Sequence, residues 1–128
     1  MTFEYQKTPR PTYSPWGAIQ EASQIFNGVW LVSTASHGGF HVSAERLAAS
    51  GFLREFAPHS FNGQGKARWF EEDCDCCLVL LAFPDEWKAW TCERGDQDLS
   101  EQMERAEQDL IEAQRTFDQW IKPKAEAA

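Results

Sequence analysis

The chain has 128 residues, a formal net charge of −8 and 42% apolar residues, with six Trp and nine Phe among them. This length suits one domain with one core, and the apolar content excludes a chain that is disordered throughout. The longest apolar run (76–83) is too short to cross a membrane. The first residues lack the pattern of a secretory signal, so we expect a cytoplasmic protein whose four cysteines are free thiols.

Three prolines lie in residues 1–15, which contain few aliphatic side chains. This composition predicts an extended N-terminal arm, followed by a single domain over 16–122 and a frayed tail over 123–128. Pro15-Trp16-Gly17 predicts a turn that leads into the first strand.

Two short-range signals predict a hairpin and its extension. Asn27-Gly28 separates two strand-like runs and is typical of a type I′ turn, in which both central residues have positive φ. Gly38-Gly39 permits a second tight reversal, with His37 held at its tip. The three expected strands are 18–26, 29–35 and about 40–42. Together they predict an antiparallel three-stranded meander with one face on the core.

Helices are expected after the meander. Ser43 is a suitable N-cap for a short helix over about 44–49, and 52–57 has the composition of another helical turn. Residues 69–83 begin with a group of acids and end in an apolar run. The acids suit a helix N-terminus and the length favours a helix, so we predict a buried central helix here. A buried strand over 77–83 is the alternative.

The last predicted element is a long acidic helix over 98–121. Apolar residues recur there at alternating spacings of four and three: Leu99, Met103, Ala106, Leu110, Ala113, Phe117 and Trp120. Asp98 as N-cap with Glu101 resembles a capping box, and Pro123 should end the helix. The domain itself or a second copy must cover this stripe. The small Ala106 and Ala113 favour packing within a monomer, with a homodimer as the alternative. The predicted class is therefore α+β: the meander, the buried central helix and this amphipathic helix.

The cysteines do not have the pattern of a metal site. Cys74, Cys76 and Cys77 lie within four residues, where a helix would place only Cys74 and Cys77 on one face. Free cysteine is also commonly buried, so core packing is the preferred interpretation. We expect neither a metal nor a cofactor.

An enzymatic alternative uses His37 with Cys74 and Asp73 as a nucleophilic set, or with the carboxylates of Glu71, Glu72 and Asp73 as general acids and bases. A helix N-terminus would lower the pKa of the Cys74 thiol, whereas the neighbouring carboxylates would raise it. These opposing effects make an activated thiolate unfavourable. The preferred interpretation has no catalytic residues and gives His37 a bracing role at the hairpin tip, while a small hydrolase-like enzyme remains the alternative.

The charge is unevenly distributed. Residues 1–70 carry four acids and six bases, whereas residues 71–128 carry sixteen acids and six bases. The acidic half disfavours direct binding to nucleic acid, because phosphate contacts require cations. It would instead attract a basic surface on a partner protein or nucleoprotein. The residues expected to contribute are Glu93, Asp96, Glu101, Glu104, Glu107, Glu112 and His37. A solvated helix face is the alternative for the helical acids.

Three segments carry a resemblance: Pro15-Trp16-Gly17, Ser33-Thr34-Ala35-Ser36-His37-Gly38-Gly39, and Trp69-Phe70-Glu71-Glu72-Asp73-Cys74 with the following Ala82-Phe83-Pro84. They are similar to a family of unknown function from bacterial plasmids, phages and integrated elements, over about 14–87. The resemblance implies a mobile-element context and supplies no catalytic residues. Small acidic proteins in that context are often inhibitors of host defence, so a candidate anti-CRISPR or anti-restriction protein is expected by association.

Overall fold

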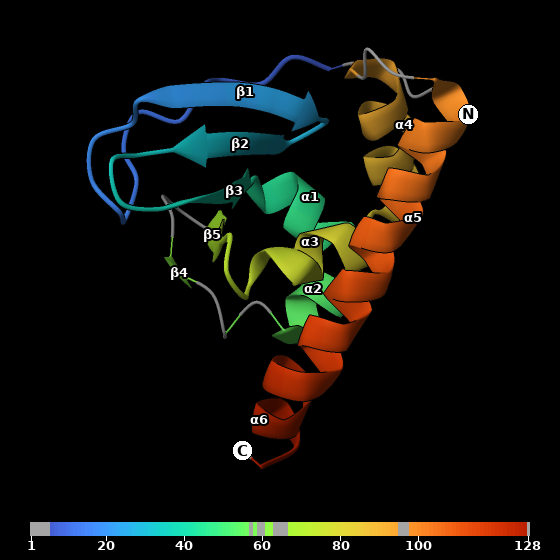
Figure 1. Ribbon diagram of the computed structural model, residues 1–128. Helices are drawn as coiled ribbons and strands as arrows, with labels where there is room; N and C mark the ends of the chain where they lie inside the picture. The colour runs from blue at the N-terminus through green and yellow to red at the C-terminus, as the bar shows by residue number, and fades with distance from the viewer. Residues whose placement is uncertain (1–5, 57, 59–60, 63–66, 95–97, 128) are drawn as a thin grey trace.

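The computed structural model describes residues 6–56, 58, 61–62, 67–94 and 98–127. Its centre is a five-stranded antiparallel sheet with the order β1-β2-β3-β5-β4 (Figure 1). The strands are β1 (Glu21–Phe26), β2 (Val29–Ser33), β3 (Gly38–Val42), the two-residue β4 (Phe61–Asn62) and β5 (Arg68–Glu71). The predicted meander is present as β1, β2 and β3. The prediction of a three-stranded sheet is wrong, because β5 and β4 extend it.

The turn between β1 and β2 has a different form from the predicted one. Gly28 has a φ of 74°, but no non-glycine residue in the described part of the chain has a positive φ. Asn27 therefore does not adopt the conformation that a type I′ turn requires. The register of β1 with β2 shifts between Gln24 and Phe26, just before the turn. A shift of this kind is typical of a β-bulge, which changes the direction of a strand.

The second reversal is made by residues 34–37. The backbone N–H of Thr34 donates to the carbonyl of His37 at 2.8 Å, and the Thr34 hydroxyl accepts from the N–H of His37 at 3.1 Å. Gly38 and Gly39 lie in β3, and neither has a positive φ. The prediction that these two glycines form the tight reversal is thus wrong. They permit close packing instead, since a Cβ on Gly39 would lie 2.7 Å from a Trp16 ring carbon.

Four helices precede the long C-terminal helix: α1 (Ala44–Ala48) and α2 (Gly51–Phe56) lie between β3 and β4, and α3 (Cys76–Ala82) and α4 (Pro84–Arg94) follow β5. Ser43 caps α1 as predicted, because its side chain accepts from the N–H of Arg46 at 3.2 Å. The helix predicted over 69–83 exists only over 76–82, and the alternative strand over 77–83 is wrong. Residues 68–71 form β5, in which Trp69 and Phe70 pack on opposite faces of the sheet.

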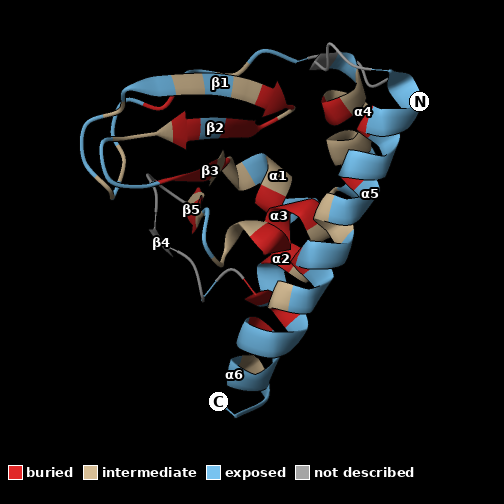
Figure 2. Cartoon of the chain, in the orientation of Figure 1, coloured by how far each residue is buried: buried red, intermediate tan, exposed pale blue. Residues whose placement is uncertain are grey.

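Both faces of the sheet are covered. The larger core joins apolar residues of the sheet to α1, α2, α3 and the C-terminal helix, and much of α3 is buried (Figure 2). Leu78 and Val79 of α3 are fully buried. On the other face Trp30, Val32 and Trp69 form a second cluster, with Trp16 and Ile19 packed against it. The predicted buried central helix is therefore present as α3, although it is short.

A long C-terminal helix crosses the other helices (Figure 1). It consists of α5 (Leu99–Thr116), a π-helical turn η2 (Phe117–Ile121) and α6 (Lys122–Ala127). Asp98 is its N-cap as predicted and accepts from the N–H of Ser100 at 2.9 Å. The prediction that Pro123 ends the helix is wrong, because α6 continues to Ala127. In the wider turn the N–H of Lys122 donates to the carbonyl of Phe117, five residues earlier, and this register gives the proline ring room.

The buried face of this helix is rotated from the predicted stripe. Ala106, Ala113 and Phe117 are buried as expected, but Leu99 is 61% exposed, Met103 48% and Trp120 54%. Gln102 and Ile121 are buried in their place. The small alanines let α5 pack closely on α3 and α4, and the π turn brings Ile121 rather than Trp120 onto the core.

Candidate functional site

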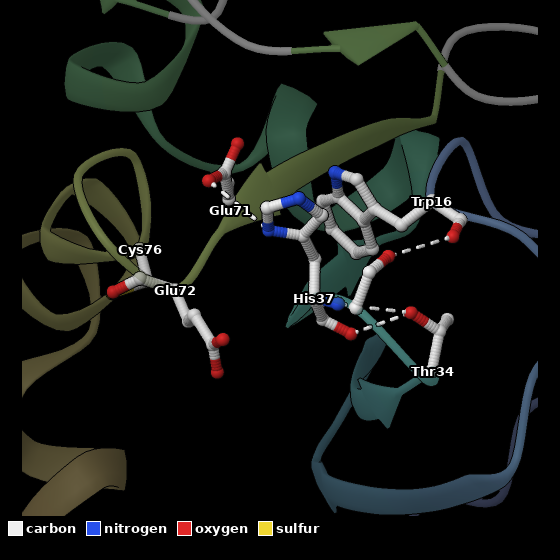
Figure 3. Close-up of polar contacts among 7 residues, drawn as sticks. Trp16, Thr34, His37, Glu71, Glu72 and Cys76 are labelled. Carbon is white, nitrogen blue, oxygen red and sulfur yellow. Dashed lines mark hydrogen bonds and ion pairs between the residues drawn. The ribbon is translucent and has the colours of Figure 1, made fainter.

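The three sequence segments singled out above meet at one end of the sheet. The hydroxyl of Ser36 donates to the carbonyl of Trp16 at 3.4 Å, which joins the first segment to the reversal of residues 34–37. The ring of Trp16 lies edge-on to that of Trp69, with centroids 5.4 Å apart. Residues far apart in the sequence therefore surround His37 (Figure 3).

The pairing of β3 with β5 determines which residues approach His37. His41 is opposite Trp69 and Gly39 is opposite Glu71, so continuation of this antiparallel register brings His37 opposite Asp73. The N–H of Glu72 donates to the carbonyl of Gly38 at 2.9 Å, which extends the pairing past the end of the strand. Because side chains alternate along a strand, Glu71 approaches His37 while Glu72 points away from it (Figure 3). Asp73 comes from the turn that follows β5.

We call His37, Glu71 and Asp73 the His37 cluster. One possible ligand atom of each residue lies within 4.8 Å of the others, and His37 Nδ1 is 3.7 Å from Glu71 Oε1. The side chain of His37 is 46% exposed and that of Glu71 is 25% exposed. Cys74 does not belong to this group. Of the residues named in the enzymatic alternative, the structure thus brings together the histidine and two carboxylates, and leaves out the thiol.

The thiols of Cys74, Cys76 and Cys77 are not activated. Burial, followed by the charge of Asp75, raises the pKa of Cys74, and burial raises the pKa values of Cys76 and Cys77 to about 12. The thiol of Cys76 donates to the carbonyl of Glu72 at 2.9 Å. Cys77 lies in the larger core, with Cys74 and Cys76 packed against it, so core packing is confirmed for these three cysteines. A protonated thiol is a poor nucleophile.

A cleft of about 270 Å³ lies between the β5–α3 turn and α5. Four carboxylates line it, those of Glu72, Asp73, Asp109 and Glu112, and the described lining contains no lysine, arginine or histidine. We call it the acidic cleft. Its apolar walls include Phe40, Leu80 and Trp87, and the indole N–H of Trp87 donates to Asp109 at 3.1 Å.

The acids proposed for partner binding are on the surface. Glu101, Glu104, Glu107 and Glu112 are exposed, and their positions on α5 place them away from the buried Ala106 and Ala113. Glu93 is also exposed, whereas Asp96 lies outside the described residues. Sequence reasoning did not foresee that Asp109 would join the acids after β5. The cleft depends on the packing of α5 near that turn, for which the sequence carries no local signal.

A second cavity, of about 580 Å³, separates residues 8–13 from the outer face of the sheet. Trp30, His41 and Trp69 line it, and burial lowers the pKa of His41. The nearby chain is held to the sheet, because the indole N–H of Trp30 donates to the Thr8 hydroxyl at 2.9 Å. The sequence had not marked this region as a site.

Comparison with known proteins identifies the family. Residues 9–126 match a family described as a domain of unknown function (DUF7007), and the chain belongs to it. The match extends beyond the segment of about 14–87 that carried the resemblance. No curated protein and no solved structure matches the chain. None of the helices in the described residues is both long enough and apolar enough to cross a membrane.

Proposed function

We propose that this member of the DUF7007 family is a protein-binding domain that attaches to a basic surface on its partner. The acidic cleft is the observation that supports this most directly. It holds four carboxylates, and its described lining offers no basic side chain to balance them. Charges of one sign in a concave site concentrate the electrostatic field, so an arginine or lysine of the partner is the complementary ligand. Trp87 adds an aromatic wall against which such a cation can pack.

The exposed glutamates of α5 add negative charge outside the cleft. Glu101, Glu104, Glu107 and Glu112 are spaced at three and five residues along the helix, and of these four Glu112 lines the cleft. Such a row of carboxylates offers the partner a substitute for nucleic-acid phosphates, which are bound by the same cations. The proposed partner is therefore a protein or nucleoprotein whose nucleic-acid-binding surface becomes blocked.

The resemblance to mobile-element proteins suggests where such a partner would be found. We propose a host defence system of the bacterial cytoplasm, with this chain acting as an inhibitor of the anti-CRISPR or anti-restriction type. The chain is proposed to act as a monomer, because the buried face of α5 is covered by its own α3 and α4.

A basic peptide can test the binding mode before the partner is identified. We would measure the binding of a labelled arginine-rich peptide by fluorescence anisotropy, at low and at physiological ionic strength. Exposed charges are screened over about 8 Å at physiological salt, so affinity should fall as salt rises. Replacing Glu101, Glu104, Glu107 and Glu112 by lysine should weaken binding at least tenfold.

The matched control reverses four exposed acids elsewhere, by replacing Glu21, Glu45, Glu55 and Glu126 with lysine. Both variants change the net charge equally. If the control weakens binding as much as the α5 variant, only the net charge matters and the proposed surface is wrong. The α5 variant should also lose bacterial proteins that the wild-type chain retains in a pull-down, and the control should retain them.

The positions of His37, Glu71 and Asp73 also bear on the hydrolase-like alternative, by favouring one of its two versions. His37 stands beside Glu71 and Asp73, which favours the version that uses carboxylates. The raised pKa of Cys74 disfavours the version that uses a thiolate.

A further inference from the structure

We infer that the His37 cluster binds a divalent transition-metal ion. The cluster offers one imidazole nitrogen and two carboxylate oxygens, which lie within 4.8 Å of one another. Imidazole and carboxylate together form a donor set typical of Zn²⁺ and Mn²⁺. This inference does not depend on the proposed function.

The distances suit a shared ion better than a direct contact. His37 Nδ1 and Glu71 Oε1 are 3.7 Å apart, which is too long for a hydrogen bond. Ligand bonds of about 2.1 Å would place neighbouring ligand atoms roughly 3.0–3.4 Å apart around one ion. Small side-chain rotations, chiefly of the exposed His37 and Asp73, would therefore complete the coordination.

The backbone already holds the three residues in place. Glu71 is paired with Gly39 in the sheet, and the Glu72 N–H donates to Gly38 one step further along. Thr34 makes backbone and side-chain hydrogen bonds to His37. A site on such fixed elements loses little conformational freedom when it takes up an ion.

The chemistry of the set indicates the class of ion. Mg²⁺ and Ca²⁺ prefer oxygen ligands alone, so the imidazole favours a transition metal. Three protein ligands leave at least one coordination position for water or a ligand, as in catalytic rather than structural zinc sites. The exposure of His37 and Asp73 gives solvent access to that position.

The experiment is titration calorimetry of EDTA-treated protein with Zn²⁺, supported by Mn²⁺ electron paramagnetic resonance. We expect saturable binding of one ion and a metal-dependent rise in melting temperature, because a ligand that binds only the folded state stabilises it. His37→Gln and Asp73→Asn should each lower the affinity at least tenfold and remove the thermal shift. Both side chains are exposed, so the melting temperatures without metal should change little.

Two control variants make the result decisive. Glu72→Gln removes the same charge as Asp73→Asn from the adjacent residue, and Cys74→Ser removes the thiol of the residue that follows Asp73. Both variants should keep the affinity. If Glu72→Gln weakens binding as much as Asp73→Asn, the acids attract ions diffusely and the inferred site is wrong. Loss of binding in Cys74→Ser, or no saturable binding by the wild-type chain, would also overturn it. Because Asp73 lines the acidic cleft too, His37→Gln tests the metal separately from the partner.

Discussion

Replacing Gly39 by alanine should disrupt the contact between β3 and β5. The added Cβ would overlap the carbonyl oxygen of Phe70 and would lie 2.7 Å from a ring carbon of Trp16 and 3.0 Å from the carbonyl carbon of Phe70. Phe70 contributes backbone atoms of β5, which lies between β3 and β4, and its side chain is fully buried. The clash therefore cannot be relieved by rotating a flexible side chain, and the two strands must move apart.

The expected loss is about 3 kcal/mol in the free energy of unfolding, at the upper end of the usual cost of overpacking. For a chain of 128 residues this corresponds to a fall of about 12 °C in melting temperature. Urea denaturation followed by tryptophan fluorescence would measure it. Gly51→Ala is the matched control, because its Cβ would meet only the Arg54 side chain, at 3.7 Å. The control should keep or slightly raise stability, since Gly51 is helical. A Gly39→Ala variant within about 0.5 kcal/mol of the wild type would refute the packing argument.

Two further predictions concern buried polar groups. Arg46 pairs with the largely buried Glu86 and lies 4.0 Å from the centroid of the Phe83 ring, so Arg46→Ala should cost about 3 kcal/mol in urea denaturation by leaving that carboxylate unpaired. Adding Glu86→Gln should recover part of the loss, and a double variant with no recovery would contradict the pairing. Burial raises the pKa values of Cys76 and Cys77 from 9.0 to about 12. Iodoacetamide at pH 8 should therefore alkylate both thiols far more slowly in the folded chain than in the denatured chain, as measured by mass spectrometry. The unfolded state releases these protons first, so stability should fall as pH rises from about 9 to 12; equal alkylation in both states would contradict the burial.

Elements with strong local signals were predicted well. The turn at Asn27-Gly28, the cap at Ser43 and the start of α5 at Asp98 each depend on a few adjacent residues, and the structure has an element at each place, although the turn is not of type I′. Strand β5 has only four residues, and the acids after it suggested the start of a helix. In the structure those acids form a turn, and α3 begins after them at Cys76. A strand this short shows too little alternation to be distinguished from a helix.

The residues of the candidate site were grouped from the sequence only in the enzymatic alternative, which left two versions open. His37, Glu71 and Asp73 each attracted attention because of residue type, and the sequence alternatives placed His37 with either a thiol or carboxylates. The choice between them required the register of β3 with β5, which no local pattern specifies. The same limit applies to the buried stripe of the C-terminal helix. Its period is regular in sequence, but the π turn at 117–121 changes which residue faces the core.

The four carboxylates of the acidic cleft repel one another in the folded state, and the other residues of the cleft do little to reduce this repulsion. Glu72 and Asp73 come from one turn and Asp109 and Glu112 from a helix some forty residues later, so only folding brings these four charges together. Like charges in one concave site repel, and the hydrogen bond from Trp87 serves only Asp109. Unfavourable arrangements of this kind are typical of functional sites, where a bound ligand can supply the opposite charge that the folded chain lacks. A cationic partner in the cleft and a metal ion at the His37 cluster would each neutralise part of this charge. Asp73 belongs to both groups, so binding at one site should alter the electrostatic field at the other.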